Sequence, residues 1–64
     1  MEYLSNVVDF GHYGFVSYQI RMKKSDFGWY QRHEWLTENG DIEIDEWIST
    51  KCLPNKTMIA IKED

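Results

Sequence analysis

Phe15-Val16-Ser17-Tyr18-Gln19-Ile20-Arg21-Met22 is the stretch of sequence that decides the fold. Apolar side chains alternate with polar ones from Val16 to Met22. Side chains in a strand point to opposite faces in turn, so this alternation is typical of a strand with one buried face. The rest of the chain can be placed as segments that pair with this strand or cover its apolar face.

The residues before this strand predict its hairpin partner. Residues 2–10 form a first candidate strand, and Gly11-His12-Tyr13-Gly14 follows it. Glycine accepts positive φ without strain, so two glycines in four residues favour a tight reversal. Residues 2–22 are therefore predicted to form an antiparallel hairpin.

The segment after the hairpin is predicted to be helical. Ser25 or Asp26 can cap a helix that runs from Phe27 to about Glu38, and Asn39-Gly40 can end it. A second helix is predicted from Asp41 to about Cys52. Its apolar residues repeat at helical spacing, and acidic residues gather in its first turn, where they suit the helix dipole. The apolar stripe consists of Ile44, Trp47, Ile48 and Cys52.

Asn39-Gly40 also supports a different prediction. The pair is a typical two-residue hairpin turn, and Trp35 and Thr37 would then face Ile44 and Ile42 across two strands. The sequence leaves the helix end and the hairpin turn open as alternatives.

A short final strand completes the predicted fold. Leu53-Pro54-Asn55 is a turn, and residues 57–61 are a short apolar strand that can add to the edge of the first hairpin. The expected class is α+β: one domain over residues 1–64, with an antiparallel three-stranded sheet in ββααβ order. One or two helices are expected to cover one face of this sheet.

Length and cysteine content limit how the fold is stabilised and where it works. The chain has 64 residues and one cysteine, Cys52, so no disulfide can form within it. A lone thiol suits a reducing cytoplasm. No signal peptide is expected, and no stretch approaches the roughly 20 apolar residues that cross a bilayer. We expect a soluble cytoplasmic protein that has no membrane contact.

No residue cluster predicts catalysis, a metal site or a cofactor. His12 and His33 are the only histidines, and with Cys52 they do not form a recognisable zinc spacing. Chains of this length rarely build a cleft that excludes water. The expected function is therefore binding without catalysis.

Charge and tryptophan identify the candidate binding residues. The net charge is −4, and no lysine or arginine lies between Arg32 and Lys51. The acidic run is either a solvated face or a patch that steers toward a basic partner. Trp29 and Trp35 lie six residues apart and cannot both be central to one helix face, so at least one should be an exposed anchor. The predicted partner-binding residues are Trp29, Glu34, Trp35, Glu38, Asp41, Glu43, Asp45 and Glu46.

The residues from Ile20 to Trp29 carry a family resemblance. Ile20-Arg21-Met22-Lys23-Lys24-Ser25-Asp26-Phe27-Gly28-Trp29 is similar to the strand-to-helix junction of the Dmd antitoxins of T-even phages. The shared pattern is Ile-x-Met-x-Lys-x-Asp-x-x-Trp, and it covers about ten residues. Membership would imply a small early phage protein that inhibits a host toxin ribonuclease by direct binding. The interruption at Asn39-Gly40 departs from the uninterrupted helix of that pattern.

Three functions follow as hypotheses. The first is a phage-type protein that binds and inhibits a host protein with a basic surface, such as a toxin or defence nuclease. The second is a structural or regulatory homodimer that associates through the last strand or the Trp29 and Trp35 surface. The third is a small nucleic-acid-binding module that uses Tyr13, Phe15 and Tyr18 beside Lys23 and Lys24; the net negative charge disfavours it.

Overall fold

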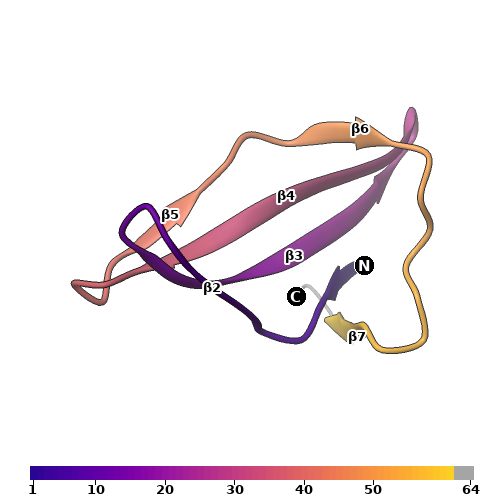
Figure 1. Ribbon diagram of the computed structural model, residues 1–64. Coiled ribbons are helices and arrows are strands. Elements are labelled where there is room, and N and C mark those ends of the chain that lie inside the picture. The colour runs from indigo at the N-terminus through magenta and orange to yellow at the C-terminus, as the bar shows by residue number, and fades with distance from the viewer. Residues whose placement is uncertain (62–64) are drawn as a thin grey trace.

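The computed structural model describes residues 1–61, which form an all-β protein (Figure 1). Within these residues there are seven strands in one antiparallel sheet and no helix. The predicted α+β class with covering helices is therefore wrong. The strands are β1 (Glu2–Leu4), β2 (Val8–His12), β3 (Phe15–Ser25), β4 (Gly28–Thr37), β5 (Ile42–Ile44), β6 (Ile48–Thr50) and β7 (Ile59–Ile61).

Two long strands, β3 and β4, form the centre of the sheet (Figure 1). The first hairpin is confirmed, because β1 and β2 both pair with β3. On the other side β5 and β6 both pair with β4, at its two ends. The last strand adds to β1, as the sequence predicts, and the connection from β6 to β7 crosses from one edge of the sheet to the other.

The predicted first helix, from Phe27 to about Glu38, is the strand β4. Asp26 and Phe27 form a tight turn instead of a helix start, and Gly28 has a φ of 120°, which favours glycine. The hydroxyl of Ser25 accepts a hydrogen bond from the Phe27 amide at 3.1 Å and stabilises this turn. Trp29 and Trp35 stand six residues apart, so on a strand they share one face.

The predicted second helix, from Asp41 to about Cys52, is also absent. A hairpin does form at Asn39-Gly40, as the alternative prediction states. Its register differs by one residue from the predicted one, because Leu36 pairs with Ile42, and Glu34 with Ile44. The loop is longer than two residues. Gly40 has a φ of 88°, and its amide donates to the Thr37 carbonyl oxygen at 3.0 Å. This is a wider hairpin loop closed by a left-handed glycine.

On each side of the central pair, the strands β1 and β2 and the strands β5 and β6 are separated by one extra residue. Three steps along β4, from Glu34 to Gln31, correspond to four steps along its neighbour, from Ile44 to Ile48. The same mismatch separates the pairing of β1 from that of β2 along β3. At that break the hydroxyl of Ser5 accepts the Ile20 amide at 2.8 Å and replaces the lost carbonyl acceptor. An extra residue of this kind is a β-bulge, which reverses the faces beyond it.

The sheet has two different faces. Residues that pair directly across strands share a face, so Tyr18, Met22, Trp29, His33 and Trp35 define one, the aromatic face. Gln19, Arg21, Lys23, Arg32 and Glu34 define the other, the charged face.

Burial is slight on both faces of this single layer. Met22, 3% exposed, is the one buried apolar side chain among residues 1–61. A sheet with one layer cannot bury its apolar side chains as two packed layers do. Residues 1–61 contain no helix that is long and apolar enough to span a bilayer.

Candidate functional site

The eight residues that the sequence singles out do not share one surface. Trp29 and Trp35 lie on the aromatic face at opposite ends of β4, whereas Glu34 lies on the charged face. The remaining five carboxylates follow one another along the outer edge of the sheet and the loop that leads into it. They are Glu38, Asp41, Glu43, Asp45 and Glu46, and all five are exposed.

These five carboxylates, together with Ile42 and Ile44, are called the acidic edge. Ile42 is 60% exposed and Ile44 is 56% exposed, and both lie on the charged face because they pair with Leu36 and Glu34. Glu43 pairs with Trp35 and points to the aromatic face. The acidic edge thus combines negative charge with two unburied β-branched side chains.

Glu34 is a member of an internal ion-pair network and not of the acidic edge. Its carboxylate accepts hydrogen bonds from Arg21 Nε at 2.8 Å and from Arg32 Nη2 at 2.9 Å. Arg21 also pairs with Glu2 at 2.8 Å. Partial burial by itself would raise the pKa of Glu34, but the hydrogen bonds from Arg21 and Arg32 outweigh it and hold that pKa below its ordinary value. The hydrogen bond to Glu34 is likewise the main reason that the pKa of Arg21 is raised.

Replacement of Glu34 by glutamine is expected to lower the free energy of unfolding by about 1–2 kcal/mol at neutral pH. The lowered pKa means that the carboxylate stabilises the fold above the ordinary glutamate pKa of about 4.3. This contribution is lost as the pH falls through that value toward the folded-state pKa. Urea titrations from pH 7 to pH 3 measure the free energy of unfolding of the parent protein and of Glu34→Gln. The difference between these two free energies should shrink as the pH falls.

The control is Glu38→Gln, at an exposed position in the loop before β5. It should change the free energy of unfolding by less than about 0.5 kcal/mol across the same range. A Glu34→Gln difference that stays constant with pH would contradict the role assigned to the Arg21 and Arg32 contacts.

Trp35 is the centre of an aromatic cluster. Its ring lies 5.0 Å from each of the rings of Phe10, Phe15 and Tyr18, and 5.4 Å from His33. Phe10 belongs to β2 and Trp35 to β4, and β3 lies between these two strands. The contact between the two rings therefore means that β2 bends over the aromatic face. Trp35 is therefore a packing residue and only in part an exposed anchor.

One hydrogen bond joins this cluster to the acidic edge. The indole Nε1 of Trp35 donates to Asp45 Oδ2 at 3.0 Å. The His33 Nδ1 atom lies 3.9 Å from the same carboxylate oxygen. Asp45 directly follows β5, where the bulge begins, and its contacts with Trp35 and His33 stabilise the packing of this segment against β4.

Trp47 does not belong to an apolar helical stripe. Its ring lies on the charged face, with Lys23 Nζ and the Arg32 guanidinium carbon each 4.4 Å from the ring centroid. Such contacts between a cation and an aromatic ring are worth about 0.5–1 kcal/mol at exposed sites. Ile44, Ile48 and Cys52, the other members of the predicted stripe, are exposed.

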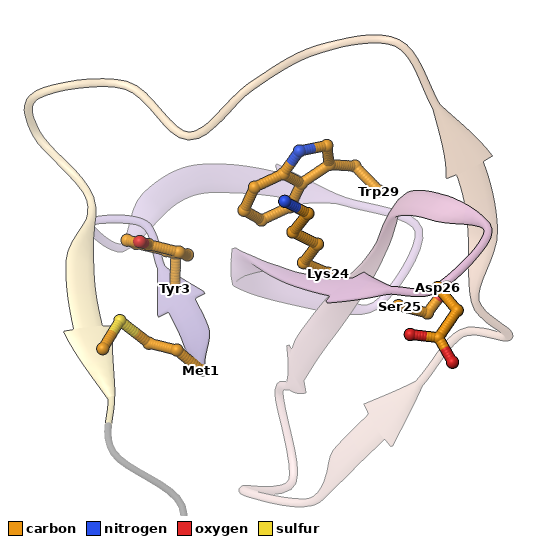
Figure 2. A pocket seen from close by; sticks show the side chains of 6 residues that line it. All are labelled: Met1, Tyr3, Lys24, Ser25, Asp26 and Trp29. Atoms are coloured by element: carbon orange, nitrogen blue, oxygen red, sulfur yellow. The ribbon is translucent and has the colours of Figure 1, made fainter.

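Trp29 lies in a different environment from Trp35. It lines an open pocket of about 490 Å³ near the turn between β3 and β4, and its ring is 5.8 Å from that of Tyr3 (Figure 2). Figure 2 shows Lys24 reaching toward Trp29, whereas Asp26 stands at the far side of the pocket. The sequence did not predict this pocket, because it depends on pairing β1 with the far end of β3.

A second hollow adjoins the acidic edge. It measures about 310 Å³ and lies on the charged face, and its lining includes Val7, Ser17, Gln19, Leu36 and Ile42. Val7 is exposed because it stands in the break between β1 and β2. Apolar side chains in this hollow, Val7 and Leu36, therefore lie beside the acidic edge on the charged face.

The side chains of residues 1–61 include no group of three or more His, Cys, Asp or Glu residues that could hold one metal ion. Sequence reasoning identified the acidic carboxylates but missed Ile42 and Ile44 as exposed residues. The period-two alternation from Asp41 to Asp45 could have placed both isoleucines on one face of a strand, but not have shown that this face is uncovered.

No protein-family model matches this sequence, and no curated protein or solved structure is significantly similar to it. The resemblance of residues 20–29 to the phage antitoxins therefore stays a prediction. In this protein those residues form the end of β3, a turn and the start of β4, not the junction of a strand with a helix.

Proposed function

We propose that this chain is a non-catalytic binding protein whose acidic edge is the centre of its contact with another protein. The observation that carries this proposal is the continuous exposure of five carboxylates beside Ile42 and Ile44. Exposed apolar side chains with a charged rim are the usual composition of a protein interface. A basic partner surface would complement the edge and speed association.

The particular role that we propose is inhibition of a host toxin or defence nuclease by a phage-type protein in the bacterial cytoplasm. A nuclease must present basic groups to bind its nucleic-acid substrate. A carboxylate-lined edge that occupies those groups would block substrate without any chemistry of its own. The choice of target follows the sequence resemblance of residues 20–29 to the phage antitoxins, although these residues form a hairpin here and not a strand-to-helix junction.

Charge reversal on the acidic edge tests this proposal. The variant Asp41→Lys with Glu43→Lys should weaken capture of the partner from bacterial lysate at least about tenfold at roughly 0.1 M salt, since both charges would oppose a basic surface. The measurement is quantitative mass spectrometry of proteins that co-purify with the tagged chain. Neither side chain takes part in a hydrogen bond or ion pair that holds the sheet together, so the fold should persist.

The matched control reverses two acids elsewhere, Asp9→Lys with Asp26→Lys. Both residues are exposed, and the net charge changes by the same amount. This control should retain capture within about threefold, because long-range attraction alone is screened within roughly 10 Å. Equal losses in the two variants, or none in either, would contradict the assignment of the contact to the acidic edge.

One observation favours a homodimer as the second candidate. Met22 is the one buried apolar side chain among residues 1–61, so a second copy stacked on a face of the sheet would supply the missing layer. Sedimentation equilibrium distinguishes the two candidates: a tight dimer that captures no other protein would favour this function over inhibition.

A further inference from the structure

The outer edge of β5 presents backbone groups that no strand within residues 1–61 pairs with, since β5 is the last strand of its sheet on that side. Antiparallel pairs alternate between those that exchange backbone hydrogen bonds and those that do not. The Asp45 amide donates to the His33 carbonyl oxygen, and the Thr37 amide donates to the Asp41 carbonyl oxygen. The odd-numbered residues of this segment therefore point their backbone groups inward, to β4.

The even-numbered residues must then point outward. The amide and carbonyl groups of Ile42 and Ile44 face away from β4, two residues apart, which is the pattern that an added strand requires. The break at Glu46 ends this exposed ladder on one side, and the loop at Gly40 ends it on the other. The site is short and specific: two residues whose four backbone groups are available together.

The side chains on this edge select what can pair with it. A strand added beside β5 would place alternate residues next to Ile42 and Ile44 on the charged face, continuing the apolar row that Leu36 begins. The residue between them would stand next to Glu43 on the aromatic face. An apolar residue is favoured at the first two positions and a lysine or arginine at the third.

The same side chains oppose pairing with a second copy of the chain. Three antiparallel registers bring Ile42 and Ile44 of two copies together, and in them Glu43 faces Glu43, Asp41 or Asp45 of the other copy. Like charges directly opposite each other destabilise a strand pair. Pairing of β5 with β5 of a second copy is therefore unfavourable, whereas pairing with a strand that carries basic residues is favourable.

From the outward groups of Ile42 and Ile44 and the acids beside them, we infer that β5 binds its partner by strand addition, and that the partner segment is extended and alternates apolar with basic residues. This inference rests on the proposed function, because it states how the acidic edge makes its contact.

A synthetic peptide in which lysine and isoleucine alternate, Lys-Ile-Lys-Ile-Lys, tests the inference. In the expected pairing the two isoleucine amides donate to the carbonyl oxygens of Ile42 and Ile44, whereas the central lysine amide points away. N-methylation of both isoleucine amides should weaken binding at least about tenfold, since two hydrogen bonds are lost. N-methylation of the central lysine amide should change the dissociation constant less than about threefold.

Variants of the protein examine the same contact from the other side. Ile44→Ala removes the side chain and keeps the outward amide, whereas Ile44→Pro removes both. Proline is tolerated on an edge strand where its nitrogen faces solvent, so pairing with β4 should survive. Ile44→Pro should bind the unmodified peptide at least about fivefold more weakly than Ile44→Ala, with the same circular dichroism spectrum.

Equal binding of the two N-methylated peptides would overturn strand addition, because the contact would then depend on charge alone. Absence of binding by the unmodified peptide would overturn it as well. In either case the proposed function can still stand, since capture of a host protein would still respond to reversal of Asp41 and Glu43. Loss of that response with peptide pairing intact would overturn the proposed function instead.

Discussion

Replacement of Trp35 by alanine is expected to lower the free energy of unfolding by about 3–5 kcal/mol, the largest effect of any single substitution in this chain. The Trp35 ring contacts Phe10, Phe15, Tyr18 and His33, which come from three different strands. Its indole also donates the hydrogen bond to Asp45. A domain of this size is rarely stabilised by more than about 3–5 kcal/mol, so Trp35→Ala should be largely unfolded at 25 °C.

Urea denaturation followed by far-ultraviolet circular dichroism measures this effect, and Trp47→Ala is the matched control. Trp47 is also half-buried, but it contacts the cations of Lys23 and Arg32 in place of an aromatic cluster. Loss of both contacts should cost only about 1–2 kcal/mol. Equal losses for the two tryptophans would contradict the placement of the packing centre at Trp35.

Replacement of Met22 by alanine is expected to cost about 2–4 kcal/mol, the second largest effect. Met22 lies in the middle of β3, between Tyr3 on β1 and Gln31 on β4, and it is 3% exposed. On the aromatic face Met22 lies between Trp29 and Trp35, so removing its side chain would leave a gap in the packing between them. The measurement is again the free energy of unfolding in urea.

Met58→Ala is the control for Met22, because Met58 is half-buried in the loop before β7 and outside the strands. It should lower the free energy of unfolding by less than about 1 kcal/mol. A Met58 loss as large as the Met22 loss would mean that the loop, and not the aromatic face, holds the main packing.

The first hairpin and the last strand could be predicted because their signals are local. Val16 to Met22 alternates without interruption, and the reversal at Tyr13-Gly14 uses two successive positive φ values, 54° and 81°. These values match the hairpin turn that glycine favours. The pairing of β7 with β1 followed from the need of a short final strand for an edge.

The helices were predicted wrongly because a bulge imitates helical spacing. Ile44 and Trp47 are three residues apart and would normally face opposite sides of a strand. The extra residue between β5 and β6 reverses the faces, so both lie on the charged face, as they would lie on one side of a helix. In β4, aromatic residues occupy both faces, which hid the period-two alternation that Trp29, His33 and Trp35 follow.

The candidate site was predictable in charge but not in geometry. The acidic run identified Glu38 to Glu46 correctly as exposed, whereas Glu34 is turned inward by Arg21 and Arg32, which only the pairing of β3 with β4 could reveal. The backbone groups of Ile42 and Ile44 depend on register, and a one-residue difference in register would have turned them inward.

The account depends most on the claim that the backbone groups of Ile42 and Ile44 face outward and are free to pair with an added strand. Amide hydrogen exchange of the free protein, followed residue by residue by NMR, tests this claim most directly. The amides of Ile42 and Ile44 should exchange rapidly, whereas those of Glu43 and Asp45, between and beside them, should be protected by bonds to β4. Alternation of fast and slow exchange over these four residues is the result expected of an unoccupied edge. Uniform protection across them, as in a helix or a covered strand, would contradict it.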